Sequence, residues 1–214
     1  MSDEKARITR LLDAVEIRIL GSLMEKQQST PEYYPMTVNS LVAACNQKSN
    51  RDPVNEYSET EIRAALDRLQ DSKLVWQILG SRVARWEHNL DRLWQVSPQQ
   101  KALLTVLFLR GAQTAGEMRG RTDRLHPFSN GEEVEQILRD LARESAPLVR
   151  EQARRAGQKE ARWVHLVGIE VPEEAPLADE RKTAEPLLTR LERLEGQMET
   201  LAAELDRLRK RLGD

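Results

Sequence analysis

The side chains in this sequence that could do chemistry are mostly cations. Apart from these, the chain offers a single cysteine, Cys45, and three widely separated histidines, His88, His126 and His165. No Cys, Asp or Glu stands at metal-ligand spacing from the histidines, and no glycine-rich loop could cradle a phosphate. We therefore expect a protein without enzymatic activity, metal or cofactor.

The lone Cys45 excludes an internal disulfide. Its neighbours at 41–44 are Leu, Val, Ala and Ala. A thiol among apolar side chains usually packs as a small hydrophobic group, so we expect Cys45 to be buried rather than reactive.

Three groups of basic and polar side chains could contact a nucleic acid. One precedes an expected helix at 58–73, one lies on that helix, and one forms the tip of a hairpin near the end of the folded part. The groups are Lys48, Asn50 and Arg51; Arg63 and Arg68; and Arg154, Arg155, Lys159 and Arg162. Such cations neutralise phosphates, and hairpin arginines can enter a minor groove. For the hairpin tip, binding and a solvated surface are equally good interpretations; for the other groups a solvated surface is favoured.

The elements that position these groups repeat one pattern. A helical segment at 61–75 is followed by a strand segment at 82–89, and a helical segment at 133–149 is followed by a strand segment at 160–167. In both, an amphipathic helix with apolar residues at 3.6 spacing runs into a hairpin whose second strand carries Ala-Arg-Trp. Each is preceded by two shorter helical patterns. Three helices and a hairpin are the order of the winged helix, a helix-turn-helix module.

We therefore predict a mainly α chain with small β-hairpins (α+β), made of two tandem winged-helix domains. The domains span 11–95 and 96–169. Capping signals predict where the helices begin: Asp13, Thr37 and Ser58 in the first domain, and Ser97, Thr114 and Asn130 or Gly131 in the second. The first helix is expected to break from Gln27.

Turn residues place the two hairpins. Gly80-Ser81 is predicted to join strands at 75–79 and 82–86. The second hairpin is predicted to rise from Leu148 to Ala153 and to return over 161–167, with a basic tip between.

Net charge separates the parts of the chain. Residues 1–95 carry 13 basic and 14 acidic side chains, residues 96–169 carry 12 and 9, and residues 170–214 carry 8 and 12. Only the second domain is basic, which is the balance that phosphate binding requires. No segment approaches the roughly 20 apolar residues of a membrane span, and the charged N-terminus has no signal sequence, so we expect a cytoplasmic protein.

The two expected recognition helices are poor candidates for reading bases. Their outer faces are Thr60, Glu61, Arg63, Ala64, Asp67, Arg68 and Asp71, and Glu132, Glu133, Glu135, Gln136, Arg139, Asp140 and Arg143. Helices that read the major groove usually present more Arg, Lys, Asn and Gln.

A heptad pattern follows an acidic, proline-containing linker at 170–183. Apolar residues spaced alternately by 4 and 3 occupy a predicted coiled-coil helix at 184–213: Leu187, Leu191, Leu194, Met198, Leu201, Leu205, Leu208 and Leu212. This seam predicts a homodimer. The alternative is a helix that folds back on its own domains.

Particular sequence motifs resemble a known family. The stretch LDAVEIRILGSLMEKQQSTPEYYPMTVNSLVAACNQKSNRDPV at 12–54, LFLRGAQTAGEMRGR at 107–121 and the hairpin at 157–166 are similar to those of the YceH family, bacterial proteins of uncharacterised function. The resemblance covers nearly the whole chain and implies tandem winged-helix domains. It implies no substrate, cofactor or catalytic residue.

The resemblance also directs attention to polar residues around the first two helices. They are Glu25, Lys26, Pro31, Tyr34, Asn39, Asn46, Gln47, Lys48, Asn50 and Arg51. Such residues can cap helices and tie down loops, or they can form a binding surface; the structural role is favoured.

Together these observations predict a non-enzymatic DNA-binding or transcription-associated factor, with double-stranded DNA as its partner. The alternative is an adaptor whose winged helices dock onto other proteins. The acidic helix faces and a net charge of −2 suit the adaptor.

Overall fold

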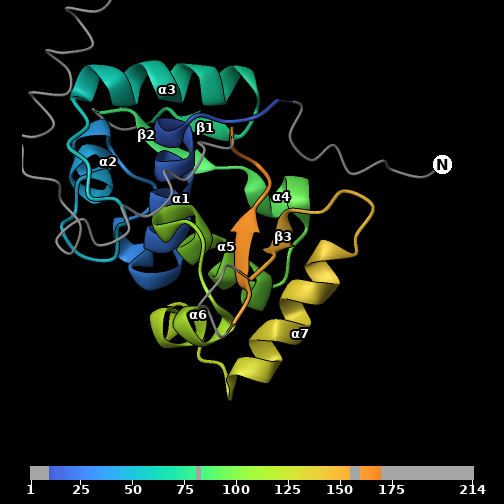
Figure 1. Cartoon of the computed structure of the whole chain (residues 1–214). Helices are drawn as coiled ribbons and strands as arrows, with labels where there is room; N and C mark the ends of the chain where they lie inside the picture. The colour runs from blue at the N-terminus through green and yellow to red at the C-terminus, as the bar shows by residue number, and fades with distance from the viewer. Residues whose placement is uncertain (1–9, 81–82, 155–159, 170–214) are drawn as a thin grey trace, which may run out of the picture. The chain divides into compact units, whose positions relative to one another are not determined.

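A computed structural model describes residues 10–80, 83–154 and 160–169 (Figure 1). By its contacts the chain divides into a unit at 1–169 and a second unit at 170–214. The predicted linker at 170–183, the coiled-coil helix at 184–213 and its seam residues lie outside the described residues, as do Arg155 and Lys159.

The described residues form seven α-helices and two antiparallel two-stranded hairpins, an α+β fold as expected. In chain order the elements are α1 (Ala14–Ser29), the 3-10 helix η1 (Pro31–Tyr33), α2 (Val38–Cys45), α3 (Glu59–Asp71), β1 (Val75–Ile78), β2 (Arg85–His88), α4 (Leu90–Trp94), α5 (Pro98–Arg110), α6 (Ala115–Thr122), α7 (Gly131–Ala142), β3 (Val149–Gln152) and β4 (Arg162–His165). None of the helices in the described ranges is long and apolar enough to cross a membrane.

The predicted helix starts are confirmed, because each capping side chain accepts a hydrogen bond from the first turn. Asp13, Ser58, Ser97 and Thr114 form reciprocal capping boxes with the residue three positions on. Thr37 and Asn130 cap α2 and α7 with the side chain alone. Hydrogen bonds between the capping residue and the residue three positions on therefore set these helix starts, and that spacing is visible in the sequence.

Two local predictions were wrong, and one helix was not predicted. Helix α1 continues to Ser29 beyond the expected break at Gln27. The second strand of the first hairpin is Arg85–His88 rather than 82–86, because its pairing places His88 opposite Val75. The short helix α4, which buries Leu90 and Trp94 completely, was not predicted. Burial of Trp86 and His88 accompanies the shifted strand, and burial of Leu90 and Trp94 accompanies α4.

The two hairpins place their tryptophans alike. Trp86 is the second residue of β2 and lies opposite Gln77, and Trp163 is the second residue of β4 and lies opposite Glu151. Both indoles are buried. Each tryptophan also exchanges two backbone hydrogen bonds with the segment before the second helix of its half, at Met36 and Gln113. The shared tripeptide thus marks one structural position in both halves.

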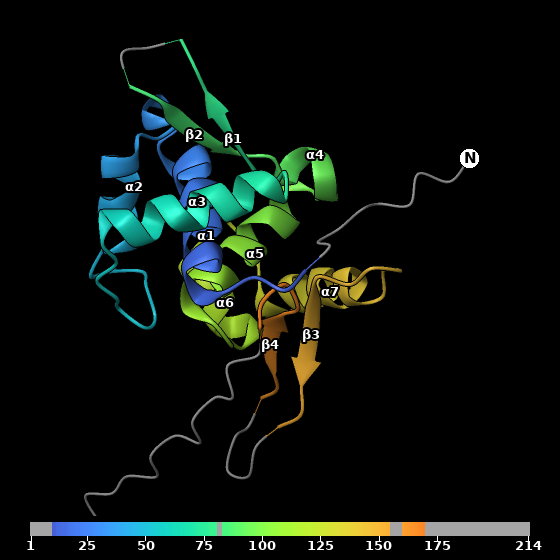
Figure 2. The same cartoon turned by 90° about the horizontal axis from the view of Figure 1, so that it is seen from above.

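Helices α1 and α5 pack together at the centre of the fold, and Figure 2 shows them between the two hairpins. A Cβ added to Gly21 would lie 2.9 Å from Phe108 Cβ and 2.9 Å from Leu109 Cδ2. The end of the second hairpin returns to the start of α1, where Leu12 N donates to Val167 O and Ile169 N donates to Leu12 O. The two halves therefore share one continuous core.

Replacing Gly21 by Val should lower the free energy of unfolding by about 1–3 kcal/mol, because the added carbons overpack the contact with Phe108. Chemical denaturation monitored by circular dichroism measures this effect. The matched control is Gly120→Ala in α6, where a Cβ meets nothing within 4 Å; it should stabilise the helix by up to about 1 kcal/mol. Equal stability of Gly21→Val and wild type would contradict the close contact.

Candidate nucleic-acid interface

Arg51, one of the candidate phosphate contacts, is a buried structural residue. Its side chain is 0% exposed and lies against Glu25, with Nη2 and Oε2 2.6 Å apart. Its Nε and Nη2 also donate to the carbonyl of Ala44, at 3.1 and 2.8 Å. A phosphate could reach this guanidinium only after these bonds broke, so the prediction for Arg51 is corrected.

A second buried arginine, Arg18, also holds the loop after α2. Its Nη1 donates to the carbonyl of Cys45 at 3.0 Å, and its Nη2 donates to the carbonyl of Pro53 at 2.7 Å. In the sequence, Arg18 stands in the middle of an amphipathic helix, and nothing there distinguishes it from a solvent-facing residue. Only its position opposite the loop reveals its role.

The expectation that Cys45 is buried is confirmed. Its Sγ lies 3.6 Å from Ser22 Oγ, and burial raises the pKa of the thiol to about 11. A thiol with this pKa is almost entirely protonated at neutral pH, which makes it a poor nucleophile.

Lys48 and Asn50 remain exposed on the same loop. The loop lies against the end of α5, where Asp52 N donates to Leu109 O at 2.9 Å and Arg110 Nη1 donates to Asn50 Oδ1 at 3.4 Å. Of the three residues predicted here, two are therefore accessible to a ligand and the third anchors the loop.

On α3 the two predicted arginines differ. Arg68 turns back to the start of α1, where its Nη2 lies 2.6 Å from Asp13 Oδ2 and its Nε lies 3.2 Å from Glu16 Oε1. Arg63 is exposed and pairs with Glu59 one turn earlier. Arg68 therefore joins two helices of the first half while its side chain stays 45% exposed. Arg63 is bound only to its own helix.

In the second hairpin, Arg162 also points inward. It donates to the carbonyl of Ala112 at 2.7 Å and pairs with Glu117 of α6 at 3.2 Å. Arg154, at the end of the rising strand, is exposed. Of the four basic residues predicted at this tip, Arg154 is thus the one that the structure describes on the surface.

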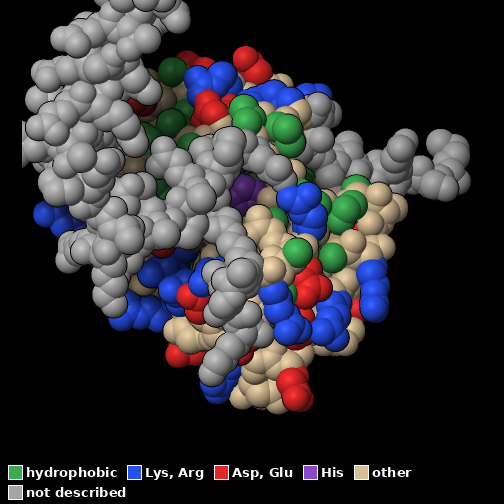
Figure 3. Space-filling model, in the orientation of Figure 1, with side chains coloured by type: hydrophobic (Ala, Val, Ile, Leu, Met, Phe, Trp, Pro, Cys, Tyr) green, Lys and Arg blue, Asp and Glu red, His purple; other side chains and the backbone are tan. Residues whose placement is uncertain are grey.

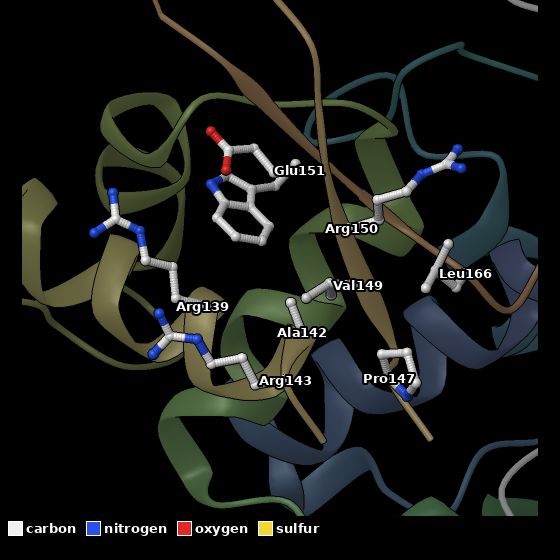
Figure 4. Close-up of a pocket in the computed structure, with 9 residues that line it drawn as sticks. Arg139, Ala142, Arg143, Pro147, Val149, Arg150, Glu151 and Leu166 are labelled. Atoms are coloured by element: carbon white, nitrogen blue, oxygen red, sulfur yellow. The ribbon is translucent and has the colours of Figure 1, made fainter. Parts of the chain in front are cut away.

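Sequence reasoning missed a cavity of about 450 Å³ between α7 and the second hairpin. Arg139 and Arg143 of α7 and Arg150 of β3 line it, together with Trp163 and Glu151. Figure 4 shows Arg139 and Arg143 extending to one side of the hairpin and Arg150 to the other. In Figure 3, Lys and Arg side chains gather over α7 and β3 with acidic side chains between them.

The arginines of α7 are only loosely paired. Arg139 lies 3.1 Å from Glu135 and is half exposed, and Arg143 lies 4.0 Å from Asp140 with 74% of its side chain exposed. Such exposed ion pairs exchange readily for other anions. Spacing of four residues along α7 was the signal that could have identified these two arginines as one surface.

Glu135 links this surface to the core. Its carboxylate accepts a hydrogen bond from Trp163 Nε1 at 3.2 Å and one from Arg139 at 3.1 Å. The corresponding position in α3, one residue after the buried Ile62, is Arg63, which cannot accept a hydrogen bond. Accordingly Trp86 Nε1 has no partner among the described residues.

Two histidines belong to the core. His88 shares a hydrogen bond with Gln27 at 2.9 Å, and His165 packs edge-on against the ring of Phe108. Burial lowers the pKa of each to about 4, so both rings are neutral at pH 7. In the parts of the chain that the structure describes, no group of three His, Cys, Asp or Glu side chains is placed to hold a metal ion.

Comparison with known proteins identifies relatives over nearly the whole chain. The profile of the family described as "Protein of unknown function, DUF480" matches residues 12–158. A UPF0502 protein of Geobacter sulfurreducens is 45% identical over 92% of this chain and 88% of its own length. UPF0502 proteins of Dechloromonas aromatica and Leptothrix cholodnii are 45% and 48% identical, over 95% and 77% of this chain and 95% and 74% of theirs. These names state no activity or partner.

Replacing Arg51 by Met should lower the free energy of unfolding by about 1–3 kcal/mol, because the carbonyl of Ala44 loses both its guanidinium donors and Glu25 keeps only Lys26, at 3.6 Å. Arg63→Met is the control: its ion pair is exposed, so the loss should stay within about 0.5 kcal/mol. Urea denaturation of both variants measures the difference. Equal, small losses would show that Arg51 is not a structural anchor.

Proposed function

The chain belongs to the family of the DUF480 profile and the UPF0502 proteins. We propose from its geometry that it is a non-enzymatic winged-helix protein that binds the backbone of double-stranded DNA. In this proposal it acts in the cytoplasm as a transcription-associated factor. The resemblance to the YceH family, like the UPF0502 names, adds no activity.

The winged-helix interpretation rests on the order and pairing of the elements. In each half three helices are followed by a hairpin, and the segment before the second helix pairs with the second strand, at Met36 with Trp86 and at Gln113 with Trp163. In a winged helix the third helix is the one that enters the DNA groove, and in this protein those helices are α3 and α7.

The observation that carries the DNA proposal is a set of exposed arginines on both sides of the second hairpin, with Arg139 and Arg143 at the end of α7 on one side and Arg150 on the other (Figure 4). Arg139, Arg143, Arg150 and Arg154 are all exposed, and residues 96–169 hold 12 basic against 9 acidic side chains. Arginines on a helix and on the adjacent hairpin can contact phosphates on both sides of a groove. The first turn of α7 is acidic, with Glu132 and Glu133, so the surface fits the backbone better than the bases.

The first half lacks such a surface. Arg51 is buried against Glu25. Arg68 is partly exposed, but two carboxylates of α1 and its cap, Asp13 and Glu16, neutralise it, and the exposed face of α3 is mainly acidic. We therefore assign the DNA contact to the second half alone.

A second candidate function is that of a protein-interaction adaptor. The exposed apolar residues of the first hairpin, Trp76, Ile78 and Leu79, favour it. Such side chains suit contact with a protein rather than with phosphates.

Substituting the basic residues should change the salt dependence of DNA binding. Replacing Arg154, Arg155 and Lys159 by Ala should flatten the slope of log K against log salt by up to ~0.9 per lost contact, and Arg139→Ala with Arg143→Ala should act in the same way. Fluorescence anisotropy with a random-sequence duplex measures the slope. Arg63→Ala is the control and should leave it unchanged.

Other results of that titration would contradict the proposal. A loss of ~1–3 kcal/mol per contact that is confined to preferred sequences in the Arg63 variant would indicate base reading by α3. Absence of binding at low salt would favour the adaptor.

We propose that the heptad positions from Leu187 to Leu212 make the protein a homodimer. Deleting residues 184–214 should convert a dimer to a monomer at micromolar concentration while leaving the far-ultraviolet signal of the helices at 14–142 intact. Light scattering measures the mass. A truncated chain that keeps its dimer mass would show that the globular part alone maintains the association.

A further inference from the structure

The first hairpin carries an unusual concentration of exposed apolar side chains. Among the described residues, half of the large hydrophobic side chains on the surface lie between positions 76 and 83: Trp76, Ile78, Leu79 and Val83. Leu79 is 79% exposed, and Trp76 and Ile78, two residues apart on one face of β1, are 41% and 38% exposed. Apolar area concentrated in this way marks an interaction surface.

Within the described ranges, no segment pairs with the outer hydrogen-bonding edge of strand β1. The strand pairs with β2 on one side, and β2 in turn pairs with Met36. Trp86 directs its N–H and C=O toward Met36, so the pair formed by Gln77 and Trp86 is not hydrogen-bonded. The N–H and C=O of Gln77 therefore point to the open side, and those of Leu79, two residues on, do the same.

The edge is open over a limited length. Val75 has the same orientation as Gln77 but is completely buried, so it offers nothing to a partner. The accessible donors and acceptors of this edge are thus those of Gln77 and Leu79.

The corresponding edge of the second hairpin is protected by charge. Matching the two registers places Trp76, Gln77 and Ile78 at the positions of Arg150, Glu151 and Gln152. Charged side chains on an edge strand discourage another strand from adding to it. Residues 74–79 read Leu-Val-Trp-Gln-Ile-Leu, with neither a charge nor a proline, so β1 has no such protection.

We propose that β1 of a second copy of this chain pairs with β1 in antiparallel orientation, forming one sheet across the two hairpins. The two open residues fix the register. Gln77 of each copy exchanges hydrogen bonds with Leu79 of the other, which places Ile78 opposite Ile78 on the two-fold axis. Trp76 then packs on the same face as the isoleucine pair.

Charge favours a second copy as the occupant of this edge. Self-pairing of β1 brings no like charges of the strand itself together, because residues 74–79 are uncharged; the nearest cation on this face is Arg92, which lies over the ring of Trp76 within its own chain, 5.0 Å from the centroid. The same register applied to β3 would set Arg150 opposite Arg154 of the other copy, which is destabilising. Two copies can therefore pair through the first hairpin and not through the second.

Four main-chain hydrogen bonds and a small apolar face make a weak contact by themselves. If the seam at 187–212 joins two chains, each edge meets its partner at a high effective concentration. The pairing is therefore tested in the full-length protein, and it does not depend on DNA binding.

The test is oxidative cross-linking of Ile78→Cys in the full chain. Residues opposite each other in a non-hydrogen-bonded antiparallel pair have Cα atoms about 4.5 Å apart, within the range of a disulfide. Native Cys45 is buried and does not compete. The matched control is Gln152→Cys, at the equivalent position of β3. If the C-terminal seam holds two chains together, it raises the local concentration of this cysteine as well.

We expect Ile78→Cys to form the intermolecular disulfide several-fold faster than Gln152→Cys on non-reducing gels. Adding Gln77→Pro should remove this excess, because proline lacks the outward N–H and is tolerated at an edge; circular dichroism checks that the variant folds. Equal rates for Ile78→Cys and Gln152→Cys would overturn the pairing and leave the edge to a strand of another protein. A faster disulfide formation by Ile78→Cys that persists after Gln77→Pro is added would also overturn the pairing.

Discussion

The close contact of α1 and α5 at Gly21 is the constraint on which the rest of the fold depends. A side chain there would meet Phe108 and Leu109 at 2.9 Å, so the two helices approach nearly backbone to backbone. Because each half buries its first helix against the other half, the remaining helices and hairpins are turned outward. The two repeated units thereby form one core and two separate outer surfaces.

Arginine performs opposite tasks in this protein. Arg18 and Arg51 are buried and hold the loop after α2 by donating to backbone carbonyls, while Arg139 and Arg143 lie exposed on α7. A guanidinium can be buried only if its donors are satisfied, and the planar group with five N–H bonds suits several carbonyls and a carboxylate at once. Counting basic residues along the chain therefore overestimates the surface available to a nucleic acid.

The two halves show how one arrangement of elements acquires different surfaces. Equivalent positions hold Arg63 and Glu135 on the third helices, and Trp76 and Arg150 on the rising strands. Glu135 satisfies the indole N–H of Trp163, whereas that of Trp86 has no described partner. The first hairpin is apolar at its edge and the second is charged, so the halves are suited to different partners.

The sequence by itself determined the helix starts, the two hairpins that carry Trp86 and Trp163, and the buried thiol. Capping boxes such as Ser58 with Glu61 depend on hydrogen bonds within four residues, and the spacing of apolar residues follows directly from helix geometry. Tertiary structure alone decided which arginines are paired within the fold, because the carboxylates facing Arg51 and Arg68 stand 26 and 55 residues away. It also decided the register of β1 with β2, since pairing with Met36 and burial of Trp86 outweighed the turn signal at Gly80.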